Sequence, residues 1–320
     1  MGKALPFRSL LTQFIAELKD RAEKAAGREF TSVVMGRPVY FVDGNEEADI
    51  LAEDTLYEIA QSVGFKDIDF QYEPIAAAFD YESQIDKEEL VLIADIGGGT
   101  SDFSLVRLSP ERAKKADRRD DILATGGVHI GGTDFDKYLS LTSIMPLLGL
   151  GSRLNNDTEV PSSYYFNLAT WHTINLAYSQ KTWLQIKDIY RDARDKAKLD
   201  SLLHLIENRS GHWLALKAEE GKIALSSQTE TELLLDRLAP STTLTLRRDE
   251  FDESIAKMVG AVENTVVNLL NDAGIAAEDV DTVVFTGGSS GVQLLREKIS
   301  ALLPDARRIE GDLFGSIGAG

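Results

Sequence analysis

Two segments that each read as a buried strand running into consecutive glycines constrain the fold of this chain most. The first apolar run covers residues 90–94 and continues into Asp95-Ile96-Gly97-Gly98-Gly99. The second covers residues 282–285 and is followed by Gly287-Gly288-Ser289. Consecutive glycines let the backbone turn tightly and direct successive N–H groups at an anion such as phosphate. We interpret the two turns, far apart in sequence, as two walls of one phosphate-binding cleft.

Polar side chains surround the first turn. Asp95 ends the strand, Thr100 closes the glycines, and Asp102 follows in a second alternating strand. Such a set could hold a hydrated Mg²⁺ and a terminal phosphate, because Mg²⁺ favours a few carboxylates plus waters over an all-protein cage. The alternative is a glycine-rich hairpin whose carboxylates are merely solvated. A P-loop is excluded because GxxxxGK[ST] is absent, and a Rossmann site is disfavoured because a strand, not a helix, follows the glycines.

A further carboxylate, Glu73, lies where a predicted strand over residues 68–72 meets a predicted helix that begins at Pro74. At that junction it could orient a water for attack on a phosphoryl group. Taken alone, the residue is better explained as an acid that interacts favourably with the dipole at a helix N-terminus.

Hydrophobic periodicity alternates between helices and strands along most of the chain, which predicts an α/β fold with a mixed sheet. Residues 146–210 break the rhythm, with polar and aromatic residues followed by a helical pattern. Trp171, Trp183 and Trp213 could mark a partner surface there, but a buried core position is the favoured interpretation. The expected helices cover residues 9–26, 48–63, 134–145, 183–205, 213–225 and 249–271, and the other expected strands cover residues 31–35, 102–108, 122–125, 231–236 and 243–247.

Composition limits the partners. The 320 residues are enough for two lobes, and the formal net charge is -18. That charge disfavours nucleic acid and anionic membrane surfaces as partners. The absence of cysteine rules out disulfides and thiolate metal sites. No apolar run is long enough to span a bilayer and no signal peptide is recognisable, so a cytoplasmic location is expected.

The motifs in series resemble the nucleotide-binding domain of the DnaK-type heat shock protein 70 family, within the actin, hexokinase and heat-shock ATPase superfamily. Several stretches look closest to the short heat-shock-like proteins of the YegD type. The resemblance runs from about Thr31 to Gly320. It rests on Gly36-Arg37-Pro38, on residues 73–78, 95–100, 131–136 and 219–227, on residues 286–289 and on Asp312.

The resemblance implies an actin-like (ribonuclease H-like) ATPase fold, with mixed sheets flanked by helices and two lobes around a nucleotide cleft. Residues 1–90 would form the remainder of lobe I, and residues 91–285 would form lobe II with an insertion at about 146–205. Residues 286–320 would be a return segment with the second turn and the start of a closing helix. The domain is expected to be truncated at both ends.

The family match also assigns roles. Glu73, Asp95 and Thr100 would be catalytic, and Asp95 and Asp102 would hold Mg²⁺ through water. The residues expected to contact ATP or ADP are Gly97, Gly98, Gly99, Thr100, Gly131, Gly132, Glu219, Lys222, Ser226, Gly287, Gly288, Ser289 and Asp312.

Two departures from the family pattern lower the expected affinity. Ile223 and Gly291 occupy positions where the family usually has arginines that pack on adenine, so stacking and cation–π contacts are lost. The family's first phosphate-gripping hairpin and its catalytic lysine are not found, so we expect weak ATP binding and little hydrolysis from these residues alone.

The function implied is a Mg-dependent ATPase module of a heat-shock-70-like chaperone that switches conformation with its nucleotide and acts on an unknown client or co-chaperone. An actin-like or MreB-like filament protein and a degenerate pseudo-ATPase interaction module are the alternatives.

Overall fold

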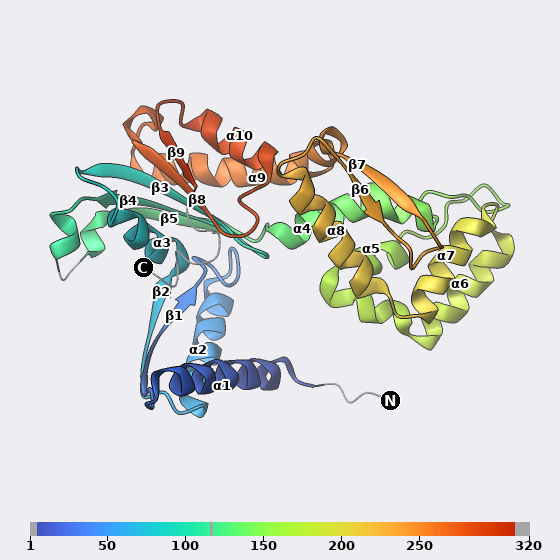
Figure 1. The fold of residues 1–320 in the computed structure, drawn as a ribbon, viewed down its shortest axis with the longest axis horizontal. Coiled ribbons are helices and arrows are strands. Elements are labelled where there is room, and N and C mark those ends of the chain that lie inside the picture. Colours follow the sequence, from blue (N-terminus) through green and yellow to red (C-terminus); the bar gives the residue numbers. More distant parts are fainter. Residues whose placement is uncertain (1–4, 116–117, 311–320) are drawn as a thin grey trace.

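A five-stranded mixed sheet forms the centre of the computed structural model, which describes residues 5–115 and 118–310 (Figure 1). The strand order is β5-β4-β3-β8-β9. β3 pairs antiparallel with β4 and parallel with β8, so the glycine turns that follow β3 and β8 emerge at the same edge. The strands are β3 (Glu89–Ile96), β4 (Ser101–Leu108), β5 (Ile122–Val128), β8 (Thr282–Thr286) and β9 (Arg307–Glu310).

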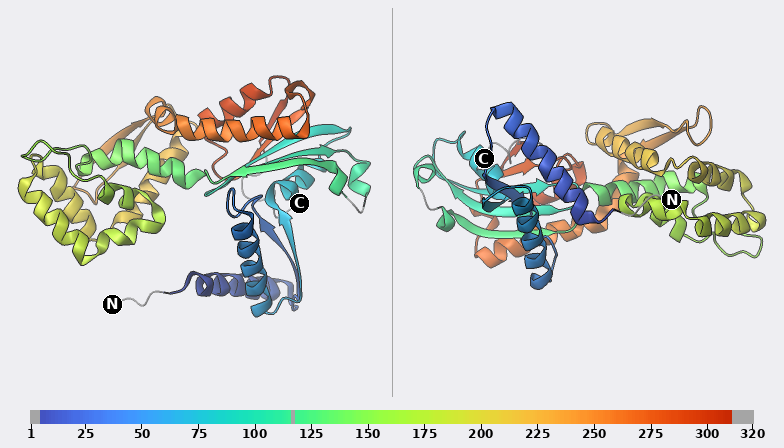
Figure 2. Two further views of the ribbon diagram at one scale, coloured as in Figure 1. Left: turned by 180° about the vertical axis from the view of Figure 1, so that it is seen from behind. Right: turned by 90° about the horizontal axis from the view of Figure 1, so that it is seen from below.

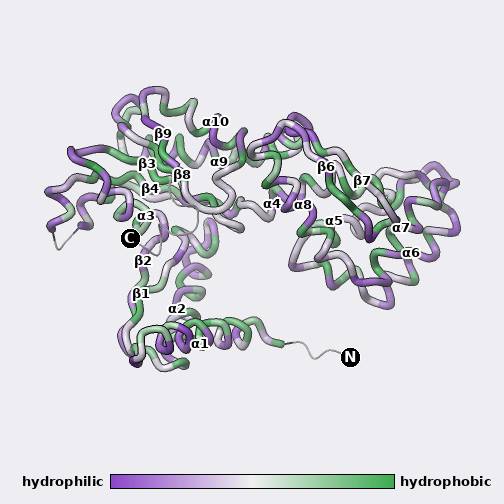
Figure 3. The backbone as a smooth tube through the Cα atoms, in the orientation of Figure 1, coloured by the Kyte–Doolittle hydropathy of each residue, from purple (hydrophilic) through white to green (hydrophobic). Residues whose placement is uncertain are grey.

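Alternating side chains of the central strands are buried on opposite faces. On one face, α3 (Glu73–Glu82) packs its Ile75 and Ala78 against Val91 and Ile93 of β3. On the other, Leu92 lies in a larger core that includes α9 (Arg248–Ala273) and α10 (Gln293–Leu302). All eight residues of β3 are buried. Figure 3 shows the matching hydrophobic colouring of the central strands. Burial on both faces explains why the β3 sequence is continuously apolar.

The N-terminal segments form a separate small layer beside the central sheet (Figures 1 and 2). Strands β1 (Ser32–Arg37) and β2 (Asp67–Tyr72) pair in parallel. Helices α1 (Phe7–Ala26) and α2 (Glu46–Ser62) pack through a small core around Ile15, Ile59 and Phe65. The strand β2 leads directly into α3, which carries the chain from this layer onto the central sheet.

Residues 132–247 form a mostly helical part that extends to the right of the central sheet in Figure 1. A two-stranded antiparallel hairpin packs against α8. The elements are α4 (Gly132–Leu139), a π-helical turn (Ser140–Ile144), a short 3-10 helix (Met145–Leu148), α5 (Ser163–Ala169), a second 3-10 helix (Trp171–Tyr178), α6 (Gln180–Asp192), α7 (Lys196–Glu207), α8 (Gly211–Leu225), β6 (Glu230–Leu234) and β7 (Thr243–Arg247).

Two details of the predicted elements were wrong. The single helix expected over residues 183–205 is two helices, because Ala193 is extended and Asp195 starts α7 by accepting a hydrogen bond from Lys198 N at 3.4 Å. The helix expected over residues 134–145 keeps its α-helical form only to Leu139. The α/β class and the mixed sheet were predicted correctly. Among the described residues, no helix is long and apolar enough to cross a membrane.

Candidate nucleotide site

The two glycine turns lie side by side at the edge where β3 and β8 end. Ser289 N donates to Ile96 O at 2.9 Å, which ties the second turn to the first. Gly287 has a φ of +81°, and a Cβ on it would lie 2.5 Å from Asp95 Oδ1 and from Ile96 O. Only glycine fits such a position without strain. The turns predicted from distant sequence segments are therefore neighbours in the structure.

The first turn is held from below by the start of α4. Thr133 N donates to Gly98 O at 2.8 Å, and Gly132 N donates to Gly97 O at 3.0 Å. A Cβ on Gly131 would come within 2.7 Å of the backbone of Gly98 and Gly99. The first amides of α4 are thus used to support the turn. Within the described residues, Gly98 N and Gly99 N donate no hydrogen bond, so both are available to an anion.

Three carboxylates gather beside these turns. Asp95 and Asp102 are directly opposite each other in the β3–β4 register. Asp102 accepts a hydrogen bond from Val39 N at 2.8 Å. Glu73, the first residue of α3, lies so close to β1 that a Cβ on Gly36 would be 3.2 Å from its Oε1. Burial, with the negative charges of Glu73 and Asp102, raises the pKa of Asp95 to about 7.

The pKa of Glu73 is raised as well, by burial and by Asp102. Among the described residues, no cation lowers the pKa of Asp95 or of Glu73. The donor set therefore suits a hydrated Mg²⁺, whose charge would stabilise the ionised carboxylates. No cluster of three or more ligand side chains arranged to hold a metal directly occurs in the described part of the chain.

A buried ion pair between Asp136 and Lys222 links α4 to α8 beside the glycine turns. Lys222 Nζ lies 2.9 Å from Asp136 Oδ1 and 3.0 Å from Oδ2, and it donates to Gly132 O at 3.2 Å. Only the Oδ2 contact has hydrogen-bond geometry. Asp136 Oδ1 is buried, and among the described residues it accepts no hydrogen bond, although Lys222 Nζ lies close to it. Burial, partly offset by Lys222 and reinforced by Glu219, raises the pKa of Asp136 to about 6. Ser289 approaches the same place, since a Cβ on Gly132 would be 2.1 Å from Ser289 Oγ.

These elements enclose a cavity of about 360 Å³. Six of the predicted contact residues line it, together with Ile223, which is 59% exposed. Of the predicted residues outside the lining, Ser226 donates to Lys222 O and lies beside Gly291, whereas Asp312 falls outside the described residues. The lining residues are Gly98, Gly132, Thr133, Asp136, Glu219, Lys222, Ile223, Gly288 and Ser289.

Sequence reasoning assigned no role to Thr133, Asp136 or Gly36. The signal for Asp136 was its position four residues after Gly132, one helical turn into α4, which places it over the same end of the helix. Gly36 was interpreted only as the end of a strand. Its contact with Glu73 joins residues 37 positions apart, and local periodicity does not reveal such a contact.

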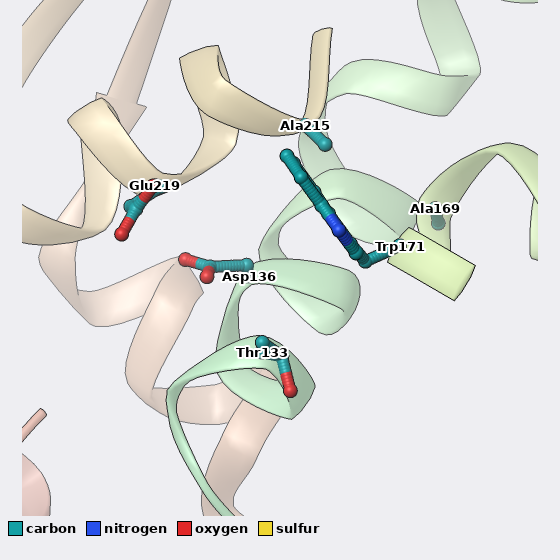
Figure 4. A pocket seen from close by; sticks show the side chains of 6 residues that line it. All are labelled: Thr133, Asp136, Ala169, Trp171, Ala215 and Glu219. Atoms are coloured by element: carbon teal, nitrogen blue, oxygen red, sulfur yellow. The ribbon is translucent and has the colours of Figure 1, made fainter. Parts of the chain in front are cut away.

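A second cavity of about 210 Å³ adjoins the first and shares Thr133, Asp136 and Glu219 with it (Figure 4). Its outer wall is Trp171, which is 49% exposed. The interpretation of Trp171 as a core residue was therefore wrong. The other two tryptophans, Trp183 and Trp213, are half-buried.

Comparison with known proteins identifies the family. A model of the family described as Hsp70 protein matches residues 1–144 and 189–311. The chaperone protein HscA homolog of Shewanella baltica is 28% identical over 312 residues, which are 96% of this chain and 39% of that protein. The chaperone protein dnaK of Cyanophora paradoxa is 27% identical over 298 residues, which are 91% of this chain and 38% of that protein. The chain thus spans about two fifths of the length of these relatives. It belongs to the Hsp70 family, and its fold is the actin-like ATPase fold.

Proposed function

We propose that the cleft binds ATP or ADP together with Mg²⁺, and that it serves as the ATPase module of an Hsp70-like chaperone. The observation that carries the proposal is the meeting of two glycine turns and a group of buried carboxylates at one sheet edge. A phosphate chain needs N–H donors at close range and a positive charge beside it. The glycine turns at this edge supply the N–H donors, and the carboxylates supply a place for a metal ion.

Each group has a distinct task in this proposal. The N–H groups of Gly98 and Gly99 bind phosphate oxygens, and Asp95 and Asp102 hold the waters around the metal ion. When bound, Mg²⁺ supplies the positive charge that lets phosphates approach these carboxylates. Glu73 orients the attacking water, since its side chain is kept in place against Gly36.

The ribose lies farther along the cavity, near Glu219 and Lys222. Lys222 is the only cation among the described residues that line the cavity, and Asp136 already pairs with it. With one partly neutralised cation, stabilisation of charge in the transition state is limited. Slow hydrolysis by these residues is the expected result.

A conformational switch follows from how the site is divided. Glu73 is carried by α3 on the central sheet, whereas Glu219 and Lys222 are carried by α8 in the helical part. A nucleotide that contacts both parts favours the arrangement in which they are close, and ADP, with one phosphate fewer, favours it less. Membership of the Hsp70 family supports a chaperone role for this switch over a filament role. The client protein and any co-chaperone would act on the whole chaperone.

Calorimetric titration of ADP into the chain, with Mg²⁺ or with EDTA, tests the proposal. Saturable binding that EDTA weakens at least about tenfold is expected, because without the metal ion the carboxylates repel the phosphates. Asp95→Asn should weaken the Mg²⁺-dependent binding. Asp188→Asn is the matched control, since Asp188 is an exposed carboxylate on α6 and its loss should change nothing. Absence of binding at millimolar ADP, or equal affinities in Mg²⁺ and EDTA, would refute the proposal.

A further inference from the structure

The cavity beside the nucleotide cavity has an unusual wall. Trp171 lies within residues 145–188, the segment that the Hsp70 family model does not match. The indole is nevertheless placed at the cleft, because the cavity that it closes shares three lining residues with the nucleotide cavity. The two cavities therefore lie side by side along Thr133, Asp136 and Glu219.

One face of the indole is open to this cavity. Figure 4 shows the ring edge-on, with a face turned toward the space that Thr133 and Asp136 border. The neighbouring wall residues Ala169 and Ala215 are small, and Figure 4 shows them on the other side of the ring from Thr133 and Asp136. The ring is also supported from the side, since it meets His212 edge to face with the centroids 5.0 Å apart and an angle of 81°. A supported aromatic face with space before it is a stacking platform for a flat ring.

Hydrogen-bond acceptors stand opposite the platform. Asp136 and Glu219 both line this cavity; the buried Asp136 Oδ1 lies 2.9 Å from Lys222 Nζ, whereas Glu219 is exposed and has no ion-pair partner among the described residues. The complementary ligand is flat and carries an N–H donor at its edge. A nucleobase with an exocyclic amino group meets both requirements.

The other end of the nucleotide cavity offers less to a base. Ile223 is aliphatic and Gly291 has no side chain, and the nearest atoms to a Cβ built on Gly291 belong to Ser226. Two guanidinium groups lie beside that end, where Arg248 donates to Leu225 O and Arg296 donates to Ser290 O, but no aromatic side chain is among the described residues that line the nucleotide cavity. The two ends thus differ, and the aromatic surface is at the Trp171 end.

We propose that the base of the bound nucleotide stacks on Trp171 and donates its amino group to Glu219. This inference rests on the proposed nucleotide function, whose phosphate contacts it leaves unchanged. Residues 145–188 then have a role in the site: they supply the base-binding wall. The ligand class is a nucleotide with an amino-bearing base, such as adenine, and a base without that group, such as hypoxanthine, should bind less well.

Titrations with Mg-ADP and with Mg-pyrophosphate separate the base from the phosphates. Trp171→Ala should weaken ADP binding about tenfold, the contribution expected of one stacked base, and leave pyrophosphate binding unchanged. Trp171→Phe should retain most of the affinity, since it keeps a ring. Phe166→Ala is the matched control, because Phe166 is a comparably exposed aromatic in the same segment, outside both cavities. In wild type, ADP should quench tryptophan emission, and in Trp171→Phe the quenching should disappear although Trp183 and Trp213 remain.

The outcomes also separate this inference from the function on which it rests. Unchanged ADP affinity in Trp171→Ala, with wild type binding both ligands, would overturn the base placement and leave the nucleotide site intact. A loss caused by Ile223→Ala in place of Trp171→Ala would put the base at the Ser226 end. If wild type binds neither ADP nor pyrophosphate, both proposals are wrong. Equal affinities for ADP and inosine diphosphate would refute the amino-group contact alone.

Discussion

Replacement of Gly131 by alanine tests how the phosphate-binding turn is supported. The φ of Gly131 is -149°, an extended conformation that alanine adopts freely, so steric contact alone decides the outcome. The new Cβ would lie 2.7 Å from backbone atoms of Gly98 and Gly99, and ordinary contact begins at 3.4 Å. Backbone cannot swing aside as a side-chain tip can. The turn and the start of α4 must therefore separate by about 0.7 Å, the difference between these distances.

This separation affects stability and binding in different ways. Overpacking of this kind costs about 1–3 kcal/mol of folding free energy. It also strains the hydrogen bonds from Gly132 N and Thr133 N that hold the turn. Loss of one charge-assisted hydrogen bond from a displaced Gly98 or Gly99 N–H to phosphate costs about 1.5–3 kcal/mol, or about 10–150-fold in affinity.

Urea denaturation and calorimetric titration of Mg-ADP measure the two effects on the same variant. Gly126→Ala is the control, because a Cβ there meets Leu269 Cδ1 at 3.4 Å and Thr265 Cγ2 at 3.8 Å, which is ordinary contact. We expect Gly126→Ala to bind Mg-ADP as wild type does. Wild-type affinity and stability in Gly131→Ala would refute the idea that Gly131 is required by its contact with the turn.

Two other substitutions test the remaining parts of the site. Lys222→Met should destabilise the fold by about 3 kcal/mol at pH 8, because it leaves the Asp136 carboxylate buried without its partner. The folded-state pKa of Asp136 is about 6, above its ordinary value of 3.8, so protonation of Asp136 favours the folded state as the pH falls. The loss of folding stability in Lys222→Met should therefore shrink toward pH 5, and Asp136→Asn should reduce it. A stability loss that does not change with pH would be inconsistent with this origin. Glu73→Gln should lower the ATP turnover rate about 100-fold while calorimetry shows unchanged Mg-ADP affinity, and a parallel loss of affinity would argue that Glu73 has a structural role.

Much of the central sheet could be predicted from the sequence because its signals are local. The apolar run of β3 and the glycines after it mark a buried strand and its turn without knowledge of the rest. The pairing of β3 with β8 was anticipated only as two walls of a cleft. The direct pairing of these strands joins residues far apart in sequence, and so do the hydrogen bonds from the α4 amides that hold the turn.

The features that were predicted wrongly or not at all have physical causes too. The break between α6 and α7 contains neither glycine nor proline, and its one local signal is Asp195 as an N-cap. Neither α10 nor β9 was predicted, and the closing helix expected at the end of the chain lies outside the described residues. Trp171 was interpreted from residue type, since tryptophan is usually well buried. Its 49% exposure depends on how other helices pack around it, which a single segment cannot reveal.

A crystal structure of the chain with Mg-ADP would test the central claim most directly. We predict phosphate oxygens within hydrogen-bond distance of Gly98 N and Gly99 N, and metal-bound waters on Asp95 and Asp102. The account would be contradicted by a nucleotide bound elsewhere on the chain, or by phosphates held away from both glycine turns.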